Sequence, residues 1–326
     1  MFFLNDFTNL TFSNKHYGGN AGLKRGVIIN NNYWLLKFPQ ETSTFDNVKI
    51  SFTTSPLSEY IGSHIYQILG YNAHKTKLGY YYNKEISKRQ LVVACEDFTD
   101  NDRYVLVDYE SIKNNYSDKL QNELIKLNER LPNYKTSGIS QHSVKIEEII
   151  LQFEMNDLFK QNTEIKDLFW EMLVIDFIIN NNDRNKNNWG LLFDKETKIY
   201  TPAPIYDNGS SFVTKHNDDK LLGIMSTEEK MTNSVLNGMC YYTIDNKLMN
   251  FRNFFKMLQN KKLDNDFNNA LKYIKSKIIK HWDEIVEFIR IIPNEEQNIR
   301  IISDIQKKFF IDSMRIRINY IFDLGL

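Results

Sequence analysis

Residues 179–212 read INNNDRNKNNWGLLFDKETKIYTPAPIYDNGSSF, and the prediction of the fold starts from them. Asp183 and Asn188 lie five positions apart, and a second aspartate, Asp207, stands in the turn YDNG. Between them, the runs WGLLF and KIYTP flank the turn-forming DKETK, which predicts a β-hairpin. Such a hairpin would bring the two aspartates to one edge of a small sheet.

This order of side chains suits the handling of a phosphoryl group. Magnesium prefers hard oxygen ligands and usually accepts one or two carboxylates, while phosphate and water complete its octahedron. Asp207 fits an ion between the terminal phosphates of a nucleotide, and Asn188 offers a neutral oxygen to a second ion. Asp183 is then free to accept the proton of an attacking hydroxyl. The pattern therefore predicts a kinase.

Asn and Asp also form ordinary turns, because their side chains hydrogen-bond to their own backbone and tolerate left-handed conformations. The sequence is rich in Asn throughout, so the spacing alone is a weak signal. The position of the motif favours a function. It directly follows LFWEMLVIDFII (residues 168–179), which is apolar nearly all round and predicts a buried helix.

The N-terminal region supplies another part of the pattern. VII (residues 27–29) and YWLLKFP (residues 33–39) predict two strands joined by an Asn turn, with Lys37 near the end of the second strand. The preceding YGGNAGLKRG (residues 17–26) would let backbone N–H groups approach an anion closely. A glycine-rich turn or a strand lysine alone is ordinary. Combined with the aspartates, they favour a phosphate-binding site in which the Lys37 head group lies outside the core.

These pieces resemble the HipA-like serine/threonine protein kinases of bacteria, and the resemblance covers most of the chain in segments. NNDRNKNN and TPAPIYDNGSSF, the specific segments, resemble the family's catalytic loop and metal-binding segment. NAGLKRG is similar to its phosphate-binding loop, WLLKFP to its ATP-lysine strand and LVVACEDF (residues 91–98) to its hinge strand. SEYIGSHIYQILGY (residues 58–71) is similar to the helix that follows, with an early Glu59.

The resemblance implies ATP and Mg²⁺ as cofactors and a Ser/Thr-bearing protein as the substrate. It implies roles for Asp183 (catalytic), Lys37, Gly22 and Lys24 (nucleotide phosphates), Glu96 and Phe98 (adenine), and Asn188 and Asp207 (magnesium). Family members usually carry His two residues after the catalytic Asp, whereas Asn185 stands here. The long toxin members have an extra N-terminal segment before the phosphate loop, so an antitoxin partner is not expected.

The expected fold is α+β, a two-lobed protein-kinase-like arrangement. Residues 1–98 would form a small β-rich lobe with one helix, and residues 99–326 a larger, mainly helical lobe that holds the catalytic and metal-binding segments. Residues 131–143 predict a loop, and the polar segment from Asp207 to Lys230 predicts an activation-like loop or an exposed connection. Residues 264–326 predict three amphipathic helices, with a break at Pro293.

Composition excludes little but is consistent with this fold. The chain has 326 residues, and its 41 Lys plus Arg balance its 41 Asp plus Glu, so charge implies no general attraction to nucleic acid or membranes. The two cysteines, Cys95 and Cys240, are too few for a disulfide framework. We expect a cytoplasmic protein, because no secretory leader and no apolar run of about 20 residues is present.

Two other functions remain open. Asp183, Asn188 and Asp207 could form the two-metal centre of a phosphoester hydrolase, although such centres usually include His or more carboxylates. The chain could also be an inactive kinase-like binding module, although a degenerate member would more often have lost one of these residues. If the chain is an active kinase, we expect autophosphorylation, with Ser13, Ser210, Ser211 and Thr214 as the candidate sites.

Overall fold

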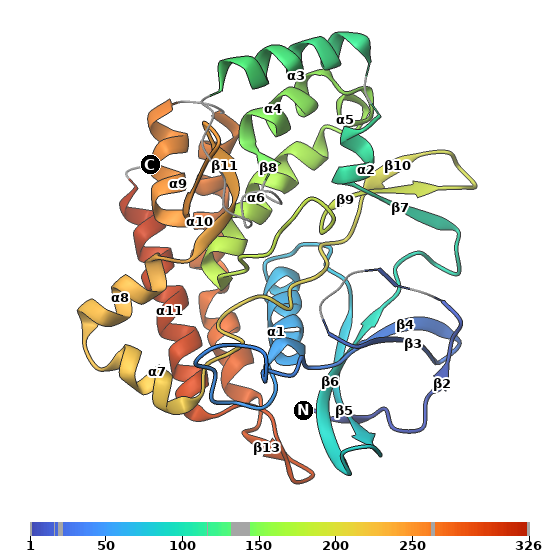
Figure 1. Ribbon diagram of the computed structural model, residues 1–326, viewed down its shortest axis with the longest axis vertical. Helices are drawn as coiled ribbons and strands as arrows, with labels where there is room; N and C mark the ends of the chain where they lie inside the picture. Colours follow the sequence, from blue (N-terminus) through green and yellow to red (C-terminus); the bar gives the residue numbers. More distant parts are fainter. Residues whose placement is uncertain are drawn as a thin grey trace.

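A computed structural model describes residues 2–15, 17–18, 22–115, 117–131, 144–261 and 265–324. Figure 1 shows a small β-rich part joined to a larger, mainly helical part, with helix α1 (Ser55–Ile68) lying where the two meet. This is the α+β, two-lobed architecture that the sequence predicts.

The small lobe is built on a six-stranded sheet of order β1-β5-β6-β4-β3-β2. Its strands are β1 (Asn5–Asp6), β2 (Thr11–Phe12), β3 (Lys24–Ile29), β4 (Asn32–Lys37), β5 (Thr76–Asn83) and β6 (Lys88–Glu96). The predicted Asn turn joins β3 to β4, where Asn30 and Asn31 have φ of +50° and +65°. Two successive positive φ values form the hairpin turn whose twist matches the strands, and Asn tolerates them well. The strands lie within residues 5–96, while the boundary at residue 98 stays a prediction.

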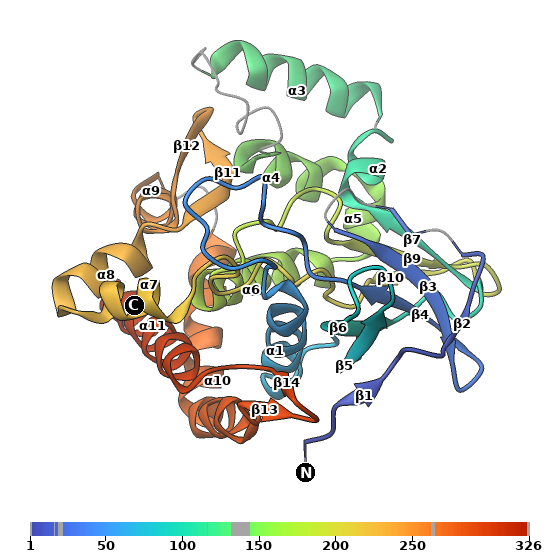
Figure 2. The same ribbon diagram turned by 60° about the horizontal axis from the view of Figure 1, so that its bottom comes forward.

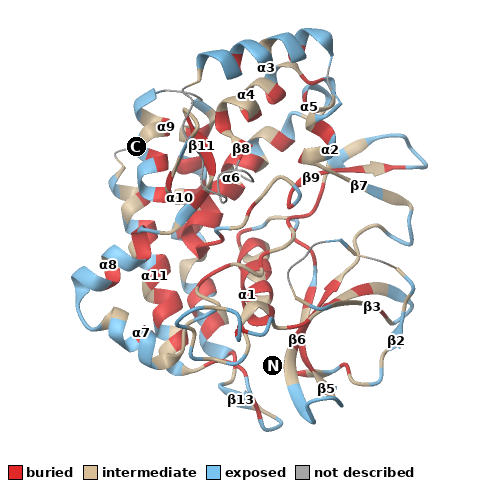
Figure 3. Ribbon diagram, viewed as in Figure 1, coloured by how far each residue is buried: buried red, intermediate tan, exposed pale blue. Residues whose placement is uncertain are grey.

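Helix α1 covers one face of this sheet. Pro56 occupies its first turn, where the missing backbone N–H would have no partner within the helix. Leu57, Ile61 and Ile65 lie four residues apart, on one face of the helix, and are fully buried. Figure 3 shows this buried face as a red band between the sheet and the helical lobe. The helix is therefore fixed against both lobes, and its first turn lies at their junction.

The larger lobe is organised around α6 (Glu164–Ile179), the buried helix that the sequence predicts. Trp170, Ile175 and even Asp176 are fully buried there, and Asn180 ends the helix in a left-handed conformation with φ of +57°. The hairpin β9 (Gly190–Asp194) and β10 (Tyr200–Pro202) follows as predicted, and β7 (Tyr104–Asp108) completes its sheet in the order β10-β9-β7.

The remaining elements are α2 (Tyr109–Lys113), α3 (Asp118–Arg130), β8 (Val144–Lys145), α4 (Ile146–Met155), α5 (Asp157–Gln161), α7 (Asp218–Met225), α8 (Glu228–Leu236), β11 (Met239–Ile244), β12 (Lys247–Asn250), α9 (Phe251–Lys261), α10 (Asn265–Ile291), β13 (Glu295–Glu296), β14 (Ile299–Arg300) and α11 (Asp304–Asp323). Of these elements, α10 and α11 pack against α6, and Figure 2 shows the arrangement from another side.

Two predictions about this lobe were wrong in detail. The C-terminal region holds two helices, α10 and α11, and the short hairpin β13–β14 stands between them where a third helix was expected, although the chain does break near Pro293. The polar segment after Asp207 is also partly helical. The side chains of Asn217 and Thr227 cap α7 and α8 there, because each accepts a hydrogen bond from the first turn of its helix.

Residues 132–143, which carry most of the predicted loop, lie outside the described residues. Both cysteines are buried and free. Within the described residues, no helix is both long and apolar enough to cross a membrane.

Candidate active site

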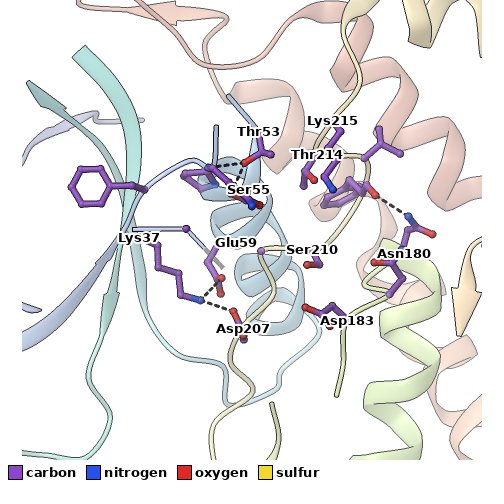
Figure 4. A pocket seen from close by; sticks show the side chains of 18 of the residues that line it. Lys37, Thr53, Ser55, Glu59, Asn180, Asp183, Asp207, Ser210, Thr214 and Lys215 are labelled. Atoms are coloured by element: carbon purple, nitrogen blue, oxygen red, sulfur yellow. Dashed lines mark hydrogen bonds and ion pairs between the residues drawn. The ribbon is translucent and has the colours of Figure 1, made fainter. Parts of the chain in front are cut away.

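Three charged side chains from distant parts of the sequence meet at the junction of the lobes. Lys37 Nζ lies 2.6 Å from Glu59 Oε2 and 2.7 Å from Asp207 Oδ1, which Figure 4 shows as dashed lines. Lys37 comes from the end of β4, Glu59 from the second turn of α1, and Asp207 from the segment after β10. The side chain of Lys37 is 15% exposed and that of Glu59 is 1% exposed. Lys37 is thus only partly buried, and it lines the cavities described below.

The Asp207 segment reaches this position because it passes very close to α1. A Cβ on Gly62 would lie 2.9 Å from the Asn208 Cβ, so a larger residue at position 62 would push the segment away from the helix. Asp207 itself has a φ of +59°, a conformation that Asp tolerates better than most residues. Close packing and a left-handed turn together direct its carboxylate toward Lys37.

Glu59 is held by more than the lysine. Its Oε1 accepts a hydrogen bond from the backbone N–H of Asn208 at 2.9 Å and lies 2.9 Å from His74 Nε2. Burial alone would raise the pKa of Glu59, but the charge of Lys37 and the hydrogen bond with His74 outweigh burial and hold this pKa well below its usual value. Conversely, burial would lower the pKa of Lys37, whereas the two carboxylates raise it. The cluster therefore contains an ammonium and two carboxylates.

Asp183 lies on the other side of the same space, in the loop after α6. Asn185 Nδ2 lies 3.4 Å from Asp183 Oδ1, so the residue that replaces the family's usual His contacts the predicted catalytic carboxylate. Burial and the nearby charge of Asp207 raise the pKa of Asp183, and the Asn185 contact partly opposes this. A raised pKa makes a carboxylate a stronger base, and therefore a more efficient proton acceptor.

Asn188 is buried behind Asp183 in the same loop. Its Nδ2 donates to the backbone carbonyl of Asp183 at 2.8 Å, which directs the amide oxygen the other way. That oxygen and the Asp207 carboxylate belong to residues that line one cavity. The donor set is therefore one carboxylate and one amide oxygen.

A buried arginine that the sequence analysis did not single out ties this loop to its surroundings. Arg184 is 1% exposed, and its guanidinium donates to Asp176 (2.8 and 3.0 Å), to the Asn188 carbonyl (3.1 Å), to Asn208 Oδ1 (2.7 Å) and to the Tyr206 carbonyl. All five N–H donors of the side chain are used. A signal existed in the sequence, because an aspartate inside the apolar run LFWEMLVIDFII requires a buried partner.

The clustered side chains separate two adjoining cavities. One, of about 720 Å³, reaches from Asp183, Asn188 and Asp207 to the hinge. The other, of about 440 Å³, extends from Asp183 toward Ser210 and Thr214, as Figure 4 shows. Four residues line both cavities: Lys24, Lys37, Asp183 and Asp207. A group that passes from one cavity to the other would therefore pass the predicted catalytic residues.

The predicted hinge residues line the larger cavity, but in different ways. Phe98 packs against Tyr206 with ring centroids 5.5 Å apart, so an aromatic pair that sequence reasoning missed forms part of the wall. The Glu96 carboxylate pairs with the exposed Lys75 at 3.0 Å. The backbone N–H of Glu96 donates to the Lys75 carbonyl at 2.8 Å.

The predicted phosphate loop is only partly described. Gly22 and Lys24 line the smaller cavity, and Gly22 has a φ of +69°, which favours glycine. Lys24 also lines the larger cavity, and its Nζ donates to the Gly18 carbonyl at 3.0 Å. Residues 19–21 of the same loop lie outside the described residues.

Comparisons with known proteins find similar sequences and folds. No family model matches the chain. The serine/threonine-protein kinase CtkA of Helicobacter pylori is 31% identical over 249 residues, which cover 76% of this chain and 68% of CtkA. The crystal structure of a Helicobacter pylori proinflammatory kinase CtkA matches with a TM-score of 0.76 and 27% identity, covering 99% of both chains. A HipA structure from Shewanella oneidensis gives a TM-score of 0.49 and 11% identity over 97% of this chain and 68% of that one.

The relative and the solved structure thus share both sequence and fold with the chain over most of its length. The fold is that of a protein kinase, and the resemblance inferred from the motifs is confirmed. The chain therefore belongs to the HipA-like serine/threonine protein kinases, the family that includes the Helicobacter kinase CtkA.

Proposed function

We propose that this protein kinase transfers the terminal phosphoryl group of ATP to Ser and Thr hydroxyls of proteins in a magnesium-dependent reaction. One observation carries the proposal. Lys37 contacts Glu59 and Asp207 at 2.6 and 2.7 Å, while Asp183 lines the same two cavities. Protein kinases need such a lysine–glutamate pair, together with a metal-binding aspartate beside it, for phosphoryl transfer.

The residues present fit a nucleotide with bound magnesium. A cavity of about 720 Å³ has apolar and aromatic walls near the hinge and charged groups at the other end. Asp207 and Asn188 supply the hard oxygen ligands that magnesium prefers, with room for phosphate and water. When bound, the ion would offset the negative charge of the phosphates. Lys37 would hold the same phosphates through its ammonium group.

Asp183 is proposed to orient the acceptor hydroxyl and to accept its proton. The raised pKa of this carboxylate supports that role, because a stronger base accepts a proton more readily. The residues nearest to it in the smaller cavity leave space for a side chain that approaches from outside the nucleotide site. Nucleotide and acceptor would thus meet where the two cavities join.

A two-metal phosphoesterase is less well supported. Lys37 Nζ lies 2.7 Å from Asp207 Oδ1, and a phosphate-binding lysine beside the metal-binding aspartate is a requirement of a kinase and not of a two-metal phosphoesterase. Two-metal centres place their ions about 3.5–4 Å apart and usually share several carboxylate or His ligands.

We also propose autophosphorylation, at fewer candidate sites than the sequence alone suggested. Ser210 and Thr214 line the cavity that contains Asp183, so their hydroxyls lie near the proposed point of transfer. Ser211 is fully buried and is no longer expected to be modified. Ser13 is next to the phosphate loop, where its backbone pairs with Gly26.

Calorimetric titration of ATP and magnesium into two variants tests the assignment. Asp183→Asn should lose turnover by orders of magnitude and keep nearly normal nucleotide affinity, whereas Asp207→Ala should lose both. Parallel losses of affinity would favour the phosphoesterase. Mass spectrometry of the wild type and of Asp183→Asn made in the same cells tests autophosphorylation. Phosphate that persists on the variant would show that another enzyme had added it.

A further inference from the structure

A third cavity adjoins the smaller cavity beside Asp183, away from the nucleotide site. This third cavity has a volume of about 560 Å³ and shares Thr53, Pro56 and His216 with the smaller one. Its wall extends to Arg89 on β6. We call these two adjoining cavities the groove; its lining extends from Asp183, past His216, to Arg89.

The loop after β4 forms one side of this groove. It crosses in front of α1 toward α7 (Figure 1). Thr54 N donates to the Thr214 carbonyl at 2.9 Å, and the Nζ of Lys215 lies 3.6 Å from the centre of the Phe45 ring. These contacts hold Lys215 at the rim of the cavity, and Figure 4 shows it on the far side from Lys37.

Three lysines and three carboxylates line the smaller cavity, and among the described residues their pairing leaves two lysines and one carboxylate, Asp183, without an ion pair. Lys37 is paired with Glu59 and Asp207. In contrast, within the described part of the chain, neither Lys24 nor Lys215 forms an ion pair with a carboxylate, and both line the smaller cavity. Cation–ring contact keeps Lys215 in place without cancelling its charge.

The far end of the groove has a similar character. Lys88 and Arg89 line it, and Arg89 donates to the backbone carbonyl of Gln297 at 3.1 Å. Arg300 is paired with Asp218 at 2.7 Å, which leaves Asp219 as the other acidic residue in the lining of this cavity. Among the residues that the structure describes, cations without an ion pair thus occur at both ends of the groove.

We propose that this groove binds the acceptor segment of the protein substrate in an extended form, and that Lys215 selects an acidic side chain near the acceptor Ser or Thr. The inference rests on the proposed function, in which the nucleotide fills the cavity on the hinge side. The acceptor hydroxyl must then reach Asp183 through the smaller cavity, where Lys215 and Lys24 favour a carboxylate. A basic side chain at the same position would be repelled.

Synthetic peptides provide the test. Each has one central Ser in a neutral background, with Glu, Gln or Lys placed singly at each of four positions on either side. For the wild type, Glu should lower the KM relative to Gln at one or more positions, by about 1.5-fold to fivefold for a partly exposed charge pair. Lys215→Gln should remove this difference and leave both the KM for ATP and the kcat with the Gln peptide unchanged. Lys215→Glu should reverse the preference in favour of Lys.

Lys220→Gln is the matched control. Lys220 is also exposed, lies in the same described segment, and is outside the lining of both cavities, so this variant should keep the preference for Glu. The inference is overturned if the wild type has equal KM for Glu and Gln at every position. It is also overturned if the preference survives in Lys215→Gln.

A binding measurement separates this inference from the proposed function. Fluorescence anisotropy of labelled peptides with Ala in place of the central Ser, measured on Asp183→Asn without ATP, requires no transfer. Tighter binding of the Glu peptide, lost in Asp183→Asn combined with Lys215→Gln, supports the groove even if no peptide is phosphorylated. Transfer with no charge preference in binding or KM would leave the kinase proposal intact and exclude the acidic selection.

Discussion

Replacing Arg184 by Met should be among the most damaging single changes in the larger lobe. The substitution keeps an apolar stem of similar length and removes all five hydrogen-bond donors. Asp176, which is fully buried, would keep only Tyr66 OH at 2.8 Å and Asn181 Nδ2 at 3.1 Å as side-chain donors. Breaking a buried ion pair by removing one partner typically costs about 3–5 kcal/mol, because the remaining charge stays buried.

The loss of the other three hydrogen-bond acceptors' donor adds to this cost, but the contributions are not strictly additive. The Tyr206 and Asn188 carbonyls and Asn208 Oδ1 each lose a donor, and a lost hydrogen bond is worth about 1 kcal/mol when water cannot replace it. Because the contacts form one network, we expect a total near 4 kcal/mol, a large part of the roughly 5–15 kcal/mol that stabilises a typical domain. Turnover should also fall at temperatures where the variant is folded, since Arg184 holds the catalytic loop against the Asp207 segment.

Urea unfolding followed by tryptophan fluorescence measures the first effect, and initial rates at low temperature measure the second. Arg184→Met combined with Asp176→Leu should recover part of the loss, because no unpaired charge remains in the core. Arg103→Met is the matched control: its bidentate partner Asp194 lies 2.8 Å away, but Arg103 is 36% exposed, so a much smaller loss is expected. A loss below about 1 kcal/mol for Arg184→Met, or strict additivity in the double variant, would refute the reasoning.

Three further predictions concern the charged cluster. Lys37→Met should abolish phosphoryl transfer and also lower the melting temperature, because Glu59 and Asp207 lose the cation that they share; full activity in this variant would exclude the phosphate-binding role. The pKa of Glu59 is depressed in the folded state, so its contribution to stability is present above its ordinary value of 4.5 and is progressively lost as the pH falls below it. The free energy of unfolding should therefore decrease more steeply with acid in the wild type than in Glu59→Gln, and equal slopes would contradict the assignment. Asp183→Asn should unfold at the same temperature as the wild type or higher, because burial raises the pKa of Asp183 and its ionised form is costly at neutral pH; a clear decrease would point to a structural role.

Local patterns in the sequence determined the elements that carry the site. The hairpin β9–β10, the Asn turn between β3 and β4, and the buried helix α6 each follow from side-chain periodicity and turn chemistry within a few residues. The order of Lys37, Asp183, Asn188 and Asp207 indicated the kinase because phosphoryl transfer needs these residue types. Their roles in catalysis remain predictions, although all four line the larger cavity.

Tertiary packing decided what no local pattern contains. Glu59 and Asp207 meet Lys37 only because α1 packs against the sheet and because Gly62 admits the Asp207 segment. Arg184 finds Asp176 across the end of α6, and both are buried because each satisfies the other. Such pairs join residues whose separation in the sequence carries no information about their separation in space. Three other features also depend on which segments fold over one another, and so on the packing of the whole core. They are the short hairpin β13–β14, the burial of Ser211 and the position of Lys215 at the groove.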